Sequence, residues 1–139
     1  SIANIEFRDL DLARGQYLYL VRIAEQPGMI QEELSEVLKV DRSTVARSVK
    51  KLEERGLIQQ RPRGENLKTK EWELTEKGKQ IYPFILGEHL YSERTALKGF
   101  SKKEVAQLEE YLIRVRENIT LDWELVKKGK KRNYSEVKK

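Results

Sequence analysis

The sequence predicts a mainly α-helical fold with one small β-hairpin (α+β), followed by long helices. Three observations predict it. Two short helix patterns flank a tight turn within residues 30–56, two extended runs meet at a glycine-containing tip within 57–74, and long helix patterns follow from residue 76. Helix, turn, helix and hairpin in this order are the outline of a winged helix-turn-helix, followed here by long helices.

The N-terminal part provides one supporting helix in this interpretation. Residues 1–11 lack a helical pattern long enough to stand alone. Residues 12–26 predict a helix with Leu18, Val21 and Ile23 facing inward, before a Pro-Gly pair ends it.

The first helix of the helix-turn-helix begins after Ile30. Leu34, Val37 and Leu38 recur at helical spacing and are predicted to share its buried face. Ile30 stands where a polar cap is common, and it can pack against the entry of the helix instead.

The second helix follows a short turn. Val45, Val49 and Leu52 define its buried side, Asp41 is placed to cap its N-terminus, and Gly56 is placed to end it. These signals predict a helix between residues 42 and 55.

The opposite face of this second helix carries hydroxyls and cations. Ser43, Arg47 and Lys50 lie almost opposite the apolar side, with Thr44 and Lys51 at its margin. Such a face suits the base edges and phosphates of a DNA groove. A solvated helix face is the plain alternative, and the surrounding turn and hairpin favour DNA.

The hairpin is predicted from two extended runs, 57–63 and 68–74, joined by a tip at 64–66. Alternation places Lys68, Lys70, Trp72 and Leu74 on one strand face. The apolar pair should anchor the hairpin, while the lysine stems carry their charges to the DNA backbone. Arg63 adds a further cation beside the tip.

After the hairpin, Thr75 can cap a long helix over residues 76–98. Its apolar positions are Ile81, Ile85 and Leu90. Pro83 lies inside and should kink it. The lone histidine, His89, lacks the further ligands that a metal site requires, so we expect no metal.

The last helix is predicted from a capping box of Ser101 and Glu104, with Phe100 and Val105 as its hydrophobic staple. Apolar residues then alternate at spacings of three and four, broken only by Asp122, at Val105, Leu108, Leu112, Val115, Ile119 and Val126. This heptad seam could pack on the preceding helix or join a second copy of the chain. The basic stretch 127–132 is either a solvated end or an additional phosphate contact.

Charge is unevenly distributed along the 139 residues. Residues 42–70 carry nine Lys/Arg and three Glu, a net +6, and residues 127–139 carry seven Lys/Arg and one Glu, also +6. Residues 1–41 sum to −4 and 71–126 to −3. Positive charge on the second helix and the hairpin is the electrostatic signature of nucleic-acid binding.

The composition excludes or disfavours several kinds of site and several classes of protein. The chain has no cysteine, which rules out disulfides and thiolate metal sites. No apolar run approaches the length of a membrane span and no signal-peptide pattern is present, so we expect a cytoplasmic protein without membrane contact. No catalytic triad, phosphate-binding glycine loop or metal cluster is apparent, so neither an enzyme nor a cofactor is expected.

Five stretches together resemble the MarR family of bacterial transcription regulators: 7–17, 31–35, 40–47, 50–58 and 74–78. The resemblance implies a homodimer that binds palindromic operators and is usually released by a small ligand. In that family the positions of Ser43, Thr44 and Arg47 meet bases or phosphates. The wing tip departs from the family pattern, with Asn66 for aspartate and Lys68 for arginine, so its base preference is open while phosphate binding is retained.

The resemblance also implies a ligand pocket between the dimerisation helices and the winged region. Arg14, Tyr17 and His89 are candidates by chain position, with structural packing as the alternative role for each. The effector would be a small aromatic or other organic compound. The family's first dimerisation helix is expected to be truncated in this sequence.

The sequence therefore predicts an N-terminal segment and helix at 1–29, a winged helix-turn-helix at 30–75, a helical dimerisation region at 76–128 and a basic tail at 129–139. We interpret the chain as a dimeric, sequence-specific DNA-binding regulator of transcription, and we expect it to act as a repressor. The alternative is a winged-helix module for protein–protein contact. The residues predicted to bind double-stranded DNA are Ser43, Thr44, Arg47, Lys50, Lys51, Arg63, Lys68 and Lys70.

Overall fold

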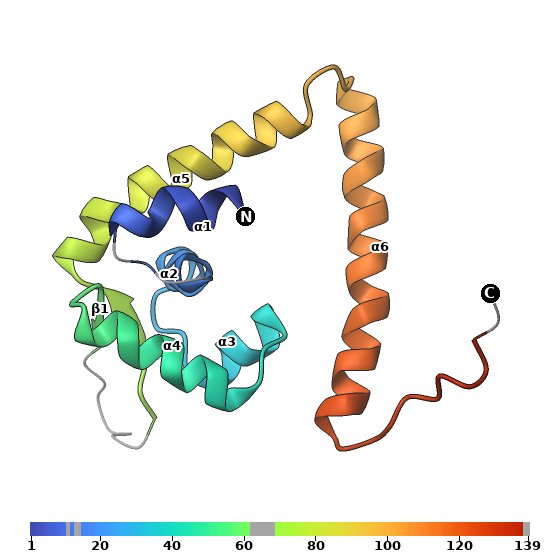
Figure 1. Cartoon of the computed structure of the whole chain (residues 1–139), viewed down its shortest axis with the longest axis horizontal. Helices are drawn as coiled ribbons and strands as arrows, with labels where there is room; N and C mark the ends of the chain where they lie inside the picture. The colour runs from blue at the N-terminus through green and yellow to red at the C-terminus, as the bar shows by residue number, and fades with distance from the viewer. Residues whose placement is uncertain (11, 13–14, 62–68, 138–139) are drawn as a thin grey trace. The chain divides into compact units, whose positions relative to one another are not determined.

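The computed structural model describes residues 1–10, 12, 15–61 and 69–137, and it divides the chain into two compact units, Ser1–Thr95 and Ala96–Lys139. The elements are α1 (Ile2–Glu6), a 3₁₀ turn η1 (Phe7–Leu10), α2 (Gln16–Glu25), α3 (Gln31–Leu38), α4 (Arg42–Glu54), β1 (Ile58–Gln60), β2 (Trp72–Leu74), α5 (Glu76–Ala96) and α6 (Lys102–Lys127) (Figure 1). This confirms the mainly α class with a small antiparallel hairpin. Among the described helices, none is both long and apolar enough to cross a membrane.

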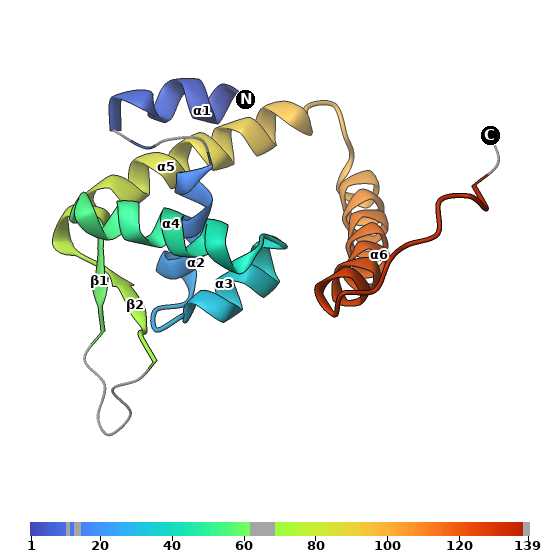
Figure 2. The same ribbon diagram turned by 60° about the horizontal axis from the view of Figure 1, so that its bottom comes forward.

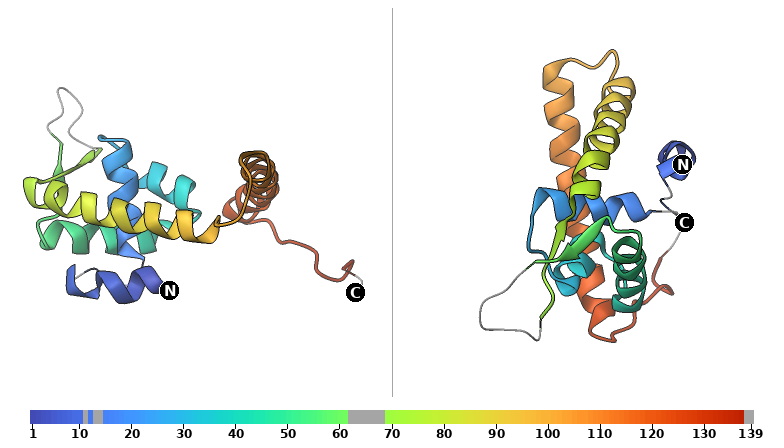
Figure 3. Two further views of the ribbon diagram at one scale, coloured as in Figure 1. Left: turned by 90° about the horizontal axis from the view of Figure 1, so that it is seen from above. Right: turned by 90° about the vertical axis from the view of Figure 1, so that its left-hand side faces the viewer.

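Helix α2 forms the centre of the first unit. It packs against α3, α4 and β2, and Figure 3 shows it running across the directions of α4 and α5. The side chains that these elements bury almost completely are Leu20, Ile23, Leu34, Val45, Val49, Leu52, Leu57, Ile58, Trp72 and Ile85. Burial of apolar area from every element stabilises the arrangement.

Local end signals set most helix boundaries as predicted. The Asp41 carboxylate accepts from the amide of Thr44 at 3.0 Å and caps α4, and Gly56 has φ +70° just after that helix ends. Thr75 Oγ1 accepts from the amide of Gly78 at 3.1 Å in the first turn of α5. The predicted caps at these three positions are confirmed.

Strands β1 and β2 form a hairpin that is anchored through Trp72. Ile58 pairs with Leu74 and Gln60 with Trp72, and the backbone of Trp72 also exchanges hydrogen bonds with Gly28 and Met29 at 2.8 and 3.0 Å. Figure 2 shows the two strands leading side by side away from the helices. The predicted apolar anchor is confirmed, because Trp72 is 2% and Leu74 8% exposed. The predicted tip, 64–66, lies outside the described residues.

The N-terminal segment differs from the prediction. Residues 2–6 are helical, and the following turn inserts Phe7 into the core with no exposed surface. Its ring meets those of Tyr17 and Phe84 edge-on, with centroids 5.2 and 6.4 Å apart. The segment is ordered by these aromatic contacts with distant residues, which helical periodicity within the segment does not reveal.

Two further expectations were wrong in detail. Helix α2 begins at Gln16 rather than at residue 12, because Gly15 adopts φ +72° immediately before it. Val37, predicted to share the buried face of its helix, is 51% exposed. Helical spacing identified a face, but the neighbouring elements cover only part of it.

Helix α5 starts close to the hairpin. A Cβ added to Gly78 would lie 2.2 Å from the carbonyl oxygen of Leu57, so only glycine fits this crossing. The helix then continues from Glu76 to Ala96 with Pro83 inside it, and the kink stays a prediction.

Helix α6, in the second unit, begins as predicted. Ser101 and Glu104 form the reciprocal capping box, with bonds of 2.9 and 3.1 Å. Unlike the helices of the first unit, α6 has no buried residue.

Candidate DNA-binding interface

The turn between α3 and α4 is fixed by a buried serine. The hydroxyl of Ser35, which is 1% exposed, donates to the carbonyl of Val40 at 2.5 Å, and the amide of Val40 donates to the carbonyl of Ser35 at 3.2 Å. Lys39 ends α3 in the left-handed conformation, with φ +54°. These contacts set the direction in which α4 leaves the turn.

Helix α4 carries five of the eight residues predicted to contact DNA. Its apolar side chains are buried against α2 and α3, and the side chains of Ser43, Arg47, Lys50 and Lys51 are exposed, while Thr44 is half-buried. The polar face that the sequence predicted is therefore accessible to solvent on α4.

A hydrogen-bond chain organises the start of this face. The two carboxylate oxygens of Asp41 accept from the hydroxyls of Ser43 and Thr44 at 2.5 and 2.6 Å. Arg47 Nη2 in turn donates to the hydroxyl oxygen of Thr44 at 3.1 Å. The bonds from Ser43 and Thr44 hold the pKa of Asp41 well below its usual range, so the carboxylate is ionised at neutral pH.

Arg42 was missed by sequence reasoning. Its guanidinium pairs with the carboxylate of Glu32 at 2.7 Å and thereby links the first turn of α4 to α3. Both side chains are more than half exposed, so the pair contributes little to stability, about 1 kcal/mol at most. The two residues belong to different helices, and neither helix pattern alone indicates the contact.

The hairpin residues are only partly described. Lys70 is exposed and lies just before β2, whereas Arg63 and Lys68 lie outside the described residues. Arg61 was not predicted as a contact residue, and its guanidinium donates to the carbonyl of Pro27 at 3.2 Å.

Two of the three candidate ligand residues, Tyr17 and His89, lie close together. The half-buried ring of Tyr17 lies 6.5 Å from the exposed ring of His89, tilted by 59°. Arg14 lies outside the described residues. Phe7 extends the same aromatic cluster through its contact with Tyr17.

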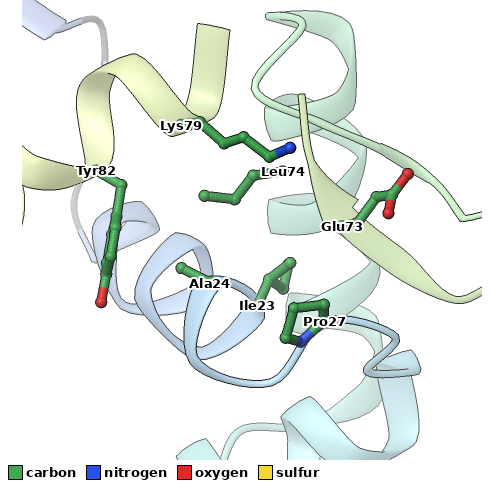
Figure 4. Close-up of a pocket in the computed structure, with 7 residues that line it drawn as sticks. All are labelled: Ile23, Ala24, Pro27, Glu73, Leu74, Lys79 and Tyr82. Carbon is green, nitrogen blue, oxygen red and sulfur yellow. The ribbon is translucent and has the colours of Figure 1, made fainter. Parts of the chain in front are cut away.

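A cavity of about 360 Å³ lies elsewhere in the first unit, between α2, β2 and the start of α5 (Figure 4). Its lining is Ile23, Ala24, Pro27, Glu73, Leu74, Lys79 and Tyr82. The Glu73 carboxylate points away from the other side chains, and it accepts from Gln59 Nε2 at 3.1 Å. Within the described ranges, no three His, Asp or Glu side chains gather as a metal site would require.

The comparisons with known proteins agree with this geometry. The sequence profile of the MarR family matches residues 12–70. The chain is also 57% identical to the uncharacterized HTH-type transcriptional regulator YybA of Bacillus subtilis (strain 168), over 96% of this chain and 89% of that protein. The chain belongs to the MarR family.

Solved structures of transcriptional regulators match most of the chain. A MarR family transcriptional regulator from Listeria monocytogenes, crystallised with 26-mer DNA, is 51% identical with a TM-score of 0.91, covering 96% of this chain and 89% of that one. The transcriptional regulator SlyA is 52% identical with a TM-score of 0.85, covering 90% and 88%. The predicted family and winged helix-turn-helix fold are confirmed, and membership of a regulator family confirms that the chain is not an enzyme.

Proposed function

We propose that this MarR-family regulator acts in the cytoplasm as a homodimer that binds a palindromic operator in double-stranded DNA, represses transcription and is released by a small organic ligand. The observation that carries the proposal is the outward face of α4, where Ser43, Arg47 and Lys50 are exposed opposite a fully packed apolar side. In helix-turn-helix proteins the N-terminal residues of the second helix contact base edges.

Support for DNA as the partner comes from charge and from a relative. The exposed face of α4 carries Arg47, Lys50 and Lys51, which suit phosphates and base acceptors. The related regulator from L. monocytogenes was crystallised with a 26-mer DNA. A protein-interaction module would instead present an apolar or acidic face on α4, so we prefer the DNA-binding interpretation.

Support for the dimer comes from α6. Within a single chain, four of its six seam residues are about half exposed: Leu112 58%, Val115 56%, Ile119 55% and Val126 49%. A second copy would cover this apolar surface, and two-fold symmetry would present two α4 helices to successive major grooves.

Support for a ligand comes from the aromatic cluster of Tyr17 and His89. Two rings 6.5 Å apart, one half-buried and one exposed, suit a planar aromatic compound.

The decisive experiment selects DNA fragments with the purified full chain and measures binding by fluorescence anisotropy. A selected palindrome should bind at least about 1,000-fold more tightly than random DNA at the same salt concentration. Equal affinity for both would refute sequence-specific regulation. In a reporter assay, transcription from the selected site should fall when the protein is present, and a rise would contradict the repressor role.

The ligand is tested on the same complex with salicylate as the aromatic probe. Salicylate should weaken operator binding by the unmodified chain, and it should do so less in a Tyr17→Ala variant. Equal weakening of both would exclude this cluster as the site.

A further inference from the structure

We propose that Ser43 reads the exocyclic amino group of an adenine or cytosine in the major groove, because its hydroxyl donates a hydrogen bond to the Asp41 carboxylate and its oxygen is left as an acceptor. The inference rests on the proposed operator binding and adds the identity of a contacted base. It follows from hydrogen-bond polarity at the exposed start of α4.

The direction of the Ser43 bond is set by Asp41. An ionised carboxylate has no proton, so at 2.5 Å from the Ser43 oxygen it can only accept. The neighbouring bond from Thr44 Oγ1, at 2.6 Å, is directed in the same way. Both hydroxyl protons are therefore committed within the protein.

The two hydroxyl oxygens differ in what remains open to DNA. Thr44 is half-buried, and its oxygen already accepts from Arg47 Nη2 at 3.1 Å. Ser43 is exposed, so its lone pairs face solvent on the DNA-facing side of α4. Ser43 therefore presents an acceptor, and Arg47 presents the donors of the same face.

A phosphate does not fit the Ser43 oxygen. Phosphate oxygens at neutral pH only accept hydrogen bonds, so they cannot pair with an acceptor. The start of a helix carries a partial positive charge of about +0.5, which would favour phosphate, but the full negative charge of Asp41 outweighs it. The donors that remain in the major groove are adenine N6 and cytosine N4, because guanine and thymine present acceptors there.

The test removes single amino groups from the DNA. After the palindrome has been selected with the unmodified chain, each adenine is replaced in turn by 2′-deoxynebularine and each cytosine by 2′-deoxyzebularine. At one position per half-site, binding by the unmodified chain should weaken about three- to tenfold, the size expected for one neutral hydrogen bond. The base at which this occurs identifies adenine or cytosine.

A Ser43→Ala variant completes a double-mutant cycle. It should bind the parent operator about three- to tenfold more weakly and show no sensitivity to the analogue at that one position. Any effect of the analogue on duplex stability is common to both proteins and cancels in the comparison. Ser43→Thr, which keeps a hydroxyl beside Asp41, should keep the sensitivity.

Asp41→Gly tests the direction of the proton, because glycine is tolerated at the helix cap and has no side-chain oxygen to accept from Ser43. The freed Ser43 hydroxyl can then donate as well as accept, so discrimination against guanine and thymine at that position should weaken. Unchanged discrimination would overturn the assigned polarity.

Two other results would overturn this inference without touching the proposed function. In the first, Ser43→Ala weakens binding to the operator and to random DNA equally, which indicates a phosphate contact. In the second, both proteins lose the same affinity at every analogue position. If no sequence is selected over random DNA, the proposed function itself fails.

Discussion

The first unit, residues 1–95, contains the winged helix-turn-helix and is called the winged unit below. It differs from helix α6 in how much of its own apolar surface it buries. In residues 1–95, side chains from α2, α3, α4 and the hairpin form one core in which many are fully buried. Helix α6 is 26 residues long, yet none of its residues is buried, and four of its six seam residues are about half exposed. Helices in proteins gain most of their stability from packing an apolar face. The first unit carries its own core, whereas α6 leaves much of its apolar face uncovered.

The largest expected change is in the free energy of dimerisation, on substitution in the seam of α6. Leu112→Asp would place an unpaired charge in an apolar dimer interface and weaken dimerisation by roughly 3–5 kcal/mol. Sedimentation equilibrium of the variant and the unmodified chain measures this. Gln107→Asp adds the same charge to α6 away from the seam and should leave the dimer nearly unchanged. An unaltered dimer in Leu112→Asp would mean that the seam does not form the interface.

The next largest expected change is in the free energy of unfolding, on substitution in the core of the winged unit. Phe7→Ala would leave a cavity between Tyr17 and Phe84 and lower the free energy of unfolding by about 3 kcal/mol. Ile5→Ala is the matched control, because Ile5 lies in the same short segment and is 66% exposed. Urea denaturation at two protein concentrations separates the regions. The loss from Phe7 should not depend on concentration, whereas a dimer defect should. Equal effects of Phe7→Ala and Ile5→Ala would contradict a core role for Phe7.

The same two regions show why the sequence predicted some features and missed others. The caps at Asp41, Thr75 and Ser101 were predicted because each depends on residues three positions away. The hairpin anchor at Trp72 was predicted because alternation along a strand is also local. These signals locate elements without knowledge of the rest of the chain.

Features that depend on distant contacts were missed. Phe7 is buried by residues from α2 and α5, so no pattern within residues 1–11 could reveal it. The exposure of Val37 likewise depends on which elements pack beside α3, and helical spacing alone does not show this. At the candidate interface, Arg42 was overlooked because its partner Glu32 belongs to another helix.

The third effect concerns base recognition by the winged unit. Arg47→Ala should weaken binding to the selected operator by about 1–3 kcal/mol and to random DNA by much less, because an arginine at a base edge donates two directed hydrogen bonds. Competition titrations with both DNAs measure the difference. Arg116→Ala removes the same charge from α6 and controls for general electrostatics. Equal losses on both DNAs for Arg47→Ala would assign Arg47 to a phosphate.

The smallest effect is expected at Lys70, beside the anchored hairpin. Trp72 and Leu74 fix β2, while the exposed lysine just before it is free to approach the DNA backbone as a point charge. Lys70→Ala should therefore weaken operator and random binding about equally, and reduce the slope of log K against log salt by about one unit. The control is Lys103→Ala at the start of α6, which lowers the net charge equally but lies in the other unit. If both variants change the slope alike, the effect reflects overall charge; if Lys70→Ala changes only operator binding, this lysine reads sequence rather than phosphate.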